Sequence, residues 1–175
     1  MPRRDARRQS GFTMLEVLIS MVIIAFGLLG VAGLQVFALK NNQSATFRST
    51  ATMLAADMTD RIKANVGGAI DGAYNAPSLA TYGTAIAGCT AAGCTTAELA
   101  QNDLFEWQQR IAVSLPAGAG IVCLDSTPHD GETSTAPECD NSGETNYVVK
   151  IWWSDDRTRS GNLARPQRFS TPFNR

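Results

Sequence analysis

The feature that most constrains this chain is an apolar run near its N-terminus. From Phe12 to Leu39 the sequence holds 28 residues with a single charge, Glu16. A helix needs about 20 apolar residues to cross a bilayer, so this run is long enough to span a membrane. A secretory signal peptide has a shorter apolar region, and an unpaired carboxylate in a simple anchor costs on the order of 1–3 kcal/mol. The run therefore predicts a membrane-inserted helix in which Glu16 has a specific task.

Charge placement predicts the direction in which this helix crosses the membrane. Arginines precede the apolar run at Arg3, Arg4, Arg7 and Arg8, and the next charge after the run is Lys40. Basic residues that flank a span stay on the cytoplasmic side. We therefore expect a single-pass protein with a cytoplasmic N-terminus and with residues 40–175 on the far side of the membrane.

The cysteines agree with this orientation, because all four follow the apolar run and their number is even, as in an oxidising compartment. Three pairings are possible. We favour Cys89–Cys94 and Cys123–Cys139, since each closes a short polar loop, and they would contribute about 2 and about 3 kcal/mol by chain entropy. Zinc is the alternative, but the chain has no Cys-x-x-Cys pair and its single histidine, His129, stands alone. We therefore predict disulfides and no metal.

Residues 10–18 (SGFTMLEVL), with the basic segment before them, resemble the class III signal of type IV prepilins and type II secretion pseudopilins. The resemblance implies that a prepilin peptidase removes residues 1–11 as a leader by cutting between Gly11 and Phe12. It also implies that Phe12 becomes the N-methylated first residue. The protein would then be anchored in a bacterial inner membrane with its C-terminal domain in the periplasm. It would later join a pilus fibre at the cell surface.

Glu16 has a physical reason to be where it is under this reading. Cleavage creates a positive α-amine at Phe12 in a medium of low dielectric constant, and the Glu16 carboxylate can neutralise such an amine on a neighbouring subunit. Gly27, Gly30 and Gly33 recur every three residues and would allow neighbouring helices to approach closely, although membrane helices are rich in glycine in any case. Residues 12–39 are therefore expected to serve first as anchor and then as filament core.

Residues 40–66 predict an amphipathic continuation of the same helix. Its apolar stripe follows spacings of three and four: Phe47, Ala51, Leu54, Met58, Ile62 and Val66. Asp57 stands four residues before Arg61, which favours a surface ion pair. No proline interrupts residues 12–66, and we expect Gly67-Gly68 to end the helix.

Residues 67–175 predict a small α+β head. Residues 67–95 read as an irregular connection, and Thr95-Thr96-Ala97-Glu98 is a capping box that starts a helix ending at Leu115-Pro116. Period-two patterns then predict strands at Gly120–Asp125 and Asn146–Ser154, with an edge strand over residues 163–171 near Pro166 and Pro172. The acidic residues between 125 and 144 lack EF-hand spacing, so we expect a solvated loop. A long helix on a small antiparallel sheet is the α/β-roll of the pilin family that residues 10–18 resemble.

The head adds a second resemblance. Residues 100–107 (AQNDLFEW), Leu115-Pro116 and the strand ending in Trp152-Trp153 resemble PilV-type minor pilins. Major pilins commonly have a helix-bending proline where this chain has Gly33. The resemblance implies a minor pilin that takes part in the initiation of pilus assembly and presents an adhesin. Its expected partners are prepilin peptidase, other minor pilins, the major pilin, the inner-membrane assembly platform and a tip adhesin.

Two other functions stay open. A minor pseudopilin of type II secretion shares the same leader chemistry, and a membrane-anchored periplasmic binding module would keep its leader. No catalytic motif is present, so we expect neither enzyme activity nor a cofactor. Removal of residues 1–11 would leave 11 basic and 15 acidic residues, and the head has no basic stripe, so nucleic acid is not an expected partner.

Overall fold

The computed structural model describes residues 11–86, 89, 93–142, 146–155 and 166–174. The chain divides into two compact units, residues 1–42 and residues 43–175, and the second is called the head below. The expected leader (except Gly11), most of the expected turn after Ser154 and the start of the expected edge strand lie outside the described residues. The elements follow in the order α1 (Met14–Ala64), α2 (Val66–Ile70), the 3-10 helix η1 (Leu79–Tyr82), α4 (Thr96–Ser114), β1 (Ala119–Leu124), β2 (Asn146–Trp153) and β3 (Gln167–Asn174).

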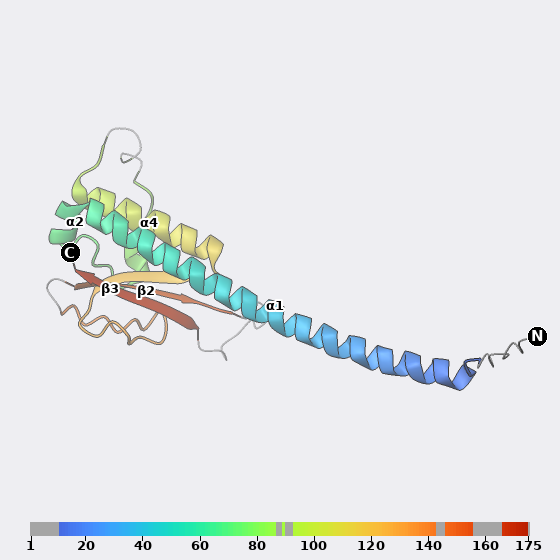
Figure 1. Cartoon of the computed structure of the whole chain (residues 1–175). Coiled ribbons are helices and arrows are strands. Elements are labelled where there is room, and N and C mark those ends of the chain that lie inside the picture. Colours follow the sequence, from blue (N-terminus) through green and yellow to red (C-terminus); the bar gives the residue numbers. More distant parts are fainter. Residues whose placement is uncertain (1–10, 87–88, 90–92, 143–145, 156–165, 175) are drawn as a thin grey trace, which may run out of the picture. The chain divides into compact units, whose positions relative to one another are not determined.

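The head is built on a three-stranded antiparallel sheet in the order β1-β2-β3. In Figure 1 the head part of α1 and all of α4 lie on one side of this sheet, and the β1–β2 connection lies on the other. The alternation of β2 explains the two-sided arrangement, because successive side chains point to opposite faces. Tyr147, Val149, Ile151 and Trp153 join the core under the helices, whereas Trp152 packs with Ile121 and Cys123 on the other face. The long helix and small antiparallel sheet confirm the expected α+β, pilin-like fold class.

Helix α4 begins and packs as its sequence predicts. Thr95 is the N-cap, and its side chain and that of Glu98 exchange hydrogen bonds with each other's backbone N–H in a complete capping box. The indole Nε1 of Trp107 donates to the carbonyl of Leu54 in α1 at 2.8 Å, which ties the two helices together. Gly120 of β1 lies directly against Trp107 and Ile111, and a Cβ at this position would collide with both side chains. Glycine therefore sets how closely α4 approaches the sheet.

The end of α1 differs from the prediction. The helix stops at Ala64, and Gly67-Gly68 lie inside the short helix α2 instead of ending α1. Asn65 separates the two helices, because its side chain accepts from the Gly68 N–H at 3.2 Å and donates to the carbonyl of Thr96 at 2.7 Å. Val66, which follows the break, is 58% exposed and is not part of the buried stripe. Earlier in α1, Ala55 is fully buried, whereas the expected Leu54 is half-buried.

The connection over residues 67–95 is more ordered than expected. Besides α2 and η1, Ala76 forms an isolated antiparallel bridge with Val122 of β1. The Tyr82 hydroxyl accepts a hydrogen bond from the Val122 N–H at 3.2 Å, and burial raises the pKa of this tyrosine well above its usual range. This segment is therefore ordered by its contacts with the sheet and not by a local sequence periodicity.

Strand β3 also differs in extent from the edge strand expected over residues 163–171. It runs through Pro172, which pairs with Val148 of β2, and it ends at Asn174. Proline lacks a backbone N–H, so it is tolerated where that side of an edge strand needs no donor.

A polar network beneath the helices links α1, α4 and the loop after α2. The Tyr74 hydroxyl donates to Asp103 Oδ2 at 2.7 Å and accepts from the Asn65 amide at 3.1 Å. Arg61 binds Asp103 Oδ1 at 2.8 Å and also reaches the expected partner Asp57 at 3.2 Å. Partial burial would lower the pKa of Arg61, but the hydrogen bond to Asp103 and the nearby carboxylates outweigh it and raise that pKa.

Candidate functional site: the N-terminal segment

The expected cleavage site lies just before helix α1. Gly11, Phe12 and Thr13 are not helical, and the Phe12 side chain is exposed. Thr13 caps the helix, because its hydroxyl accepts from the backbone N–H of Glu16 at 3.3 Å and its carbonyl accepts from the same N–H at 3.1 Å. The peptide Gly11–Phe12, which is the expected cleavage site, therefore lies outside regular structure.

Glu16 lies in the first turn of α1, where a negative charge interacts favourably with the positive end of the helix dipole. Its residue is exposed, and no described residue forms an ion pair with its carboxylate. The structure thus leaves this acid available to a group outside the described residues.

No described residue covers the apolar surface of the first part of helix α1. Every described residue from Gly11 to Gln43 is exposed, including large side chains such as Phe26, Leu29 and Phe37. Of the helices in the described residues, α1 is the one that is long and apolar enough to cross a membrane, with a mean hydropathy of 2.6 in its candidate window and none of that window buried. A signal sequence can be equally long and apolar, so length and hydropathy alone do not distinguish the two. The motif before the helix is therefore needed to interpret α1. Such a surface requires lipid or other protein around it.

No contact with a described residue explains the three regularly spaced glycines of α1. A Cβ added at Gly27, Gly30 or Gly33 would meet no heavy atom within 4 Å. Gly120 in the head, by contrast, is required by a close contact. If Gly27, Gly30 and Gly33 have a packing role, their partner lies outside the described residues.

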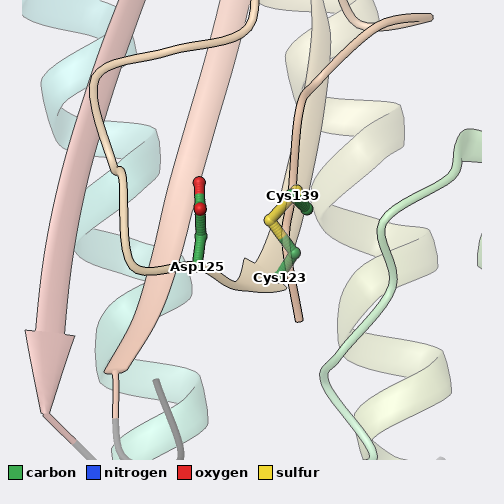
Figure 2. Close-up of side chains that lie close together, drawn as sticks. All are labelled: Cys123, Asp125 and Cys139. Carbon is green, nitrogen blue, oxygen red and sulfur yellow. A yellow bond between two sulfur atoms is a disulfide. The ribbon is translucent and has the colours of Figure 1, made fainter. Parts of the chain in front are cut away.

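The cysteines form two disulfides, Cys89–Cys94 and Cys123–Cys139, the same local pairs that the sequence favours. Their Cα atoms lie 4.8 and 6.2 Å apart, within the usual range for such bonds. The Cys123–Cys139 bond fastens the β1–β2 connection to β1 on the face away from the helices (Figure 2).

Asp125 comes close to this second disulfide and completes a group of three residues, two cysteines and one aspartate, whose ligand atoms lie within 4.8 Å of one another. The two sulfur atoms are bonded to each other and so are not thiolate ligands. Asp125 Oδ2 instead meets the ammonium nitrogen of Lys150 at 2.6 Å. The cluster therefore consists of a disulfide beside an ion pair and is not a metal site.

The buried pair Lys150–Asp125 is the feature that the sequence reasoning missed. Both side chains are fully buried, and the Lys150 ammonium also lies 2.7 Å from Asp130 Oδ1. Its acidic composition predicted a solvated loop, but two of its aspartates pair with a buried lysine. A lysine on the sheet face opposite Tyr147, Val149 and Ile151, in an otherwise apolar strand, is the signal that could have revealed it.

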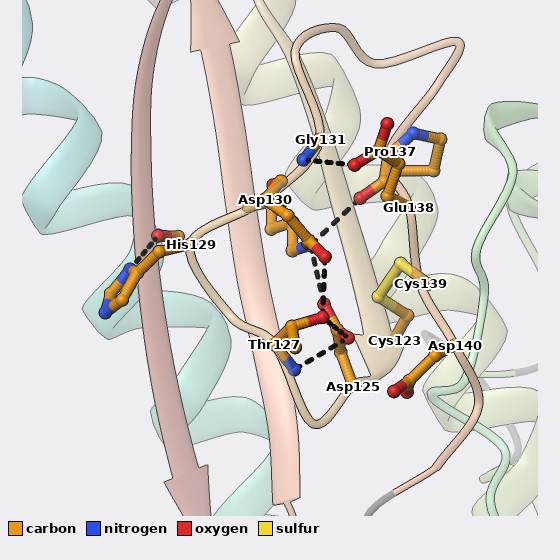
Figure 3. Close-up of polar contacts among 12 residues, drawn as sticks. Cys123, Asp125, Thr127, His129, Asp130, Gly131, Pro137, Glu138, Cys139 and Asp140 are labelled. Carbon is orange, nitrogen blue, oxygen red and sulfur yellow. Dashed lines mark hydrogen bonds and ion pairs between the residues drawn. A yellow bond between two sulfur atoms is a disulfide. The ribbon is translucent and has the colours of Figure 1, made fainter.

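Hydrogen bonds shape the rest of this connection (Figure 3). Burial would raise the pKa of Asp130, but hydrogen bonds from Lys150 and Thr127 outweigh it and hold that pKa below its usual value. Hydrogen bonds from the hydroxyls of Ser126 and Ser142 lower the pKa of Asp140 far below its usual range. Both carboxylates thus accept hydrogen bonds from other residues of the chain, and these bonds favour the charged form.

Two known protein families match consecutive parts of this chain. The family described as the prokaryotic N-terminal methylation motif matches residues 6–32, and the family described as type IV pilin Tt1218 matches residues 33–105. The first match contains the whole predicted processing site, and the second follows without a gap. The chain is a type IV pilin-like protein.

The type IV pilin family is a family of structural, non-enzymatic proteins, and the prepilin motif of this chain implies processing by prepilin peptidase in a pilus context. The motif and the exposed apolar helix indicate a membrane-anchored pilin. No curated protein and no solved structure matches the chain. The resemblance to PilV-type subunits is not confirmed by these comparisons.

Proposed function

We propose that this protein is a minor pilin that is matured by prepilin peptidase and takes part in the initiation of pilus assembly. The observation that carries the proposal is the combination of the motif Gly11-Phe12-Thr13-Met14-Leu15-Glu16 with an apolar helix that no described residue covers from Phe12 to Leu39. The motif supplies a processing signal, and the uncovered helix needs neighbours of the same kind. Gly33, at a position where major pilins commonly have proline, favours a minor subunit.

Maturation is the first step of the proposed role. The peptidase cuts between Gly11 and Phe12, removes the basic leader and methylates the Phe12 amine. The cleavage site suits this reaction because the scissile peptide precedes the cap residue Thr13 and is not helical. The mature protein then remains in the inner membrane through residues 12–39, with the head in the periplasm.

Assembly is the second step. The Glu16 carboxylate neutralises the new α-amine of a neighbouring subunit, so that two charges enter the apolar filament core as a pair. The proposed neighbours are other minor pilins and the major pilin, brought together at the inner-membrane assembly platform. A head outside the membrane is then positioned to present an adhesin at the filament tip.

Maturation is tested by co-expression of the full chain with its prepilin peptidase. We expect the mature protein to begin at methylated Phe12, as read by N-terminal sequencing and intact mass. A chain that keeps its leader would instead fit a membrane-anchored binding module, and a start at any other residue would contradict the proposed site.

Assembly is tested separately with Glu16→Ala and with Glu16→Gln, which keeps the size of the side chain. Both variants should be cleaved normally yet fail to restore pili, counted by electron microscopy, in a strain that lacks the native gene. Unaltered piliation would remove the charge-pairing role. Loss of type II secretion, with pili intact, in the gene-deletion strain would favour the pseudopilin alternative.

A further inference from the structure

One side chain in the middle of β2, Lys150, contacts the connection that follows β1 at several points. We call residues 125–142 the clamped loop. The fully buried ammonium of Lys150 lies 2.6 Å from Asp125 Oδ2 and 2.7 Å from Asp130 Oδ1. It also donates to the carbonyls of Asp130 at 3.2 Å and Pro137 at 2.9 Å. Its partners thus come from the start, the middle and the later part of the clamped loop.

Further contacts of the clamped loop with the sheet are also non-covalent. The Arg168 guanidinium of β3 donates to the carbonyls of His129 and Gly131, and the Trp152 indole donates to the same Gly131 carbonyl at 3.3 Å. Gly131 is well suited to this place, because it has a φ of +85° and a Cβ would collide with Pro137. The disulfide Cys123–Cys139 joins the loop to β1 at a single point.

Burial makes the loop and Lys150 depend on each other. An ammonium ion inside a protein is strongly destabilised unless carboxylate or carbonyl oxygens surround it. Among the described residues, the oxygens that contact the Lys150 ammonium all belong to the clamped loop, so β2 can keep this lysine buried only when the loop is seated. Asp125 is equally buried and needs the ammonium ion in return.

We propose that Lys150 seats the clamped loop before its disulfide forms, and that the Cys123–Cys139 bond closes on a loop already in place. Seating brings Cys139 beside Cys123 and thereby selects one of the three possible cysteine pairings. In the closing step the two thiols lose two protons and two electrons to a disulfide oxidant such as oxidised glutathione. The oxidant is reduced to two thiols through a mixed disulfide.

The first experiment measures hydrogen exchange by mass spectrometry on the full chain in detergent micelles. The samples are wild type, wild type under reducing conditions, Cys123→Ala with Cys139→Ala, and Lys150→Met. Lys63→Met, a change at an exposed lysine of α1, is the matched control. We expect reduced wild type and the cysteine variant to keep the protection of residues 125–142. Lys150→Met should lose protection about a hundredfold there, even when oxidised.

Amides of β1 and β2 report whether the head is still folded in each sample. If Lys150→Met unfolds the sheet as well, Asp130→Asn decides, because it removes one partner whose side chain is one-third exposed and leaves the Lys150–Asp125 pair. This variant should lower loop protection about tenfold with the strands unaffected. Loop protection that disappears on reduction of wild type, or that survives both Lys150→Met and Asp130→Asn, would overturn the proposal.

The second experiment tests the selection of the pairing. Wild type, Lys63→Met and Lys150→Met are reduced, unfolded and then refolded with oxidised glutathione, and their disulfides are mapped by peptide mass spectrometry. Wild type and Lys63→Met should form Cys123–Cys139 almost exclusively, whereas Lys150→Met should form a mixture that includes bonds from Cys123 to Cys89 or Cys94. Equal yields of the native pair in all three proteins would refute a role for Lys150 in its formation.

Discussion

Replacement of Tyr74 by Phe tests whether the polar network under the helices stabilises the head. The substitution removes one hydroxyl and keeps the ring, which is fully buried. It leaves Asp103 Oδ2 without its 2.7 Å donor and leaves the Asn65 amide with only the Thr96 carbonyl. A hydrogen bond to a charged group contributes about 1.5–3 kcal/mol, so we expect the free energy of unfolding to fall by about 2 kcal/mol.

The matched control is Tyr147→Phe. The Tyr147 hydroxyl donates to the Ala69 carbonyl at 3.0 Å, a neutral acceptor, and this residue is also fully buried. Its loss should cost about 1 kcal/mol. Urea unfolding of the full chain in a non-ionic detergent, followed by tryptophan fluorescence, measures both values. If Tyr147→Phe is the more damaging variant, or if Tyr74→Phe is neutral, the charged acceptor does not carry the stability assigned to it.

Three further predictions concern the head. Gly120→Ala should lower the free energy of unfolding by about 1–3 kcal/mol, because the new methyl group collides with Ile111 and must displace α4; thermal unfolding measures it, and an unchanged midpoint would contradict the close contact. Cys123→Ala with Cys139→Ala should cost about 3 kcal/mol in urea through the entropy of the unfolded chain, and a cost near zero would refute this loop-closure estimate. Stability should fall as the pH rises above about 10, because burial and the hydrogen bond to Asp103 raise the pKa of Tyr74 in the folded state while unfolded tyrosine ionises near that pH. Unfolding measured from pH 8 to 11 should show a smaller loss for Tyr74→Phe than for wild type, and equal slopes would count against it.

Local patterns in the sequence were sufficient for α4, for most of α1 and for most of the strands, but not for α2 and η1. The capping box at Thr95 and Glu98 placed the start of α4, and the alternation around Tyr147 and Val149 placed β2. Such signals act between residues a few positions apart, so they are readable without a fold. The end of α1 was misplaced because Asn65 breaks the helix with partners that lie nine and 31 positions further along the chain.

The N-terminal segment could be interpreted almost entirely from the sequence. The motif from Gly11 to Glu16, the length of the apolar run and the arginines before it are contiguous, and length and charge act on a membrane directly. The structure added that Thr13 caps the helix and that no described residue pairs with Glu16. Processing at Gly11–Phe12 and the role of Glu16 in assembly stay predictions.

The underside of the sheet was decided by tertiary structure alone. Composition described residues 125–144 as an acidic loop, and nothing local distinguishes a solvated aspartate from one paired inside the protein. Asp125 and Asp130 reach Lys150 across separations of 25 and 20 residues, and only the folded chain removes water from these groups. Burial makes the charges of Lys150, Asp125 and Asp130 depend on one another, because charges removed from water must be paired.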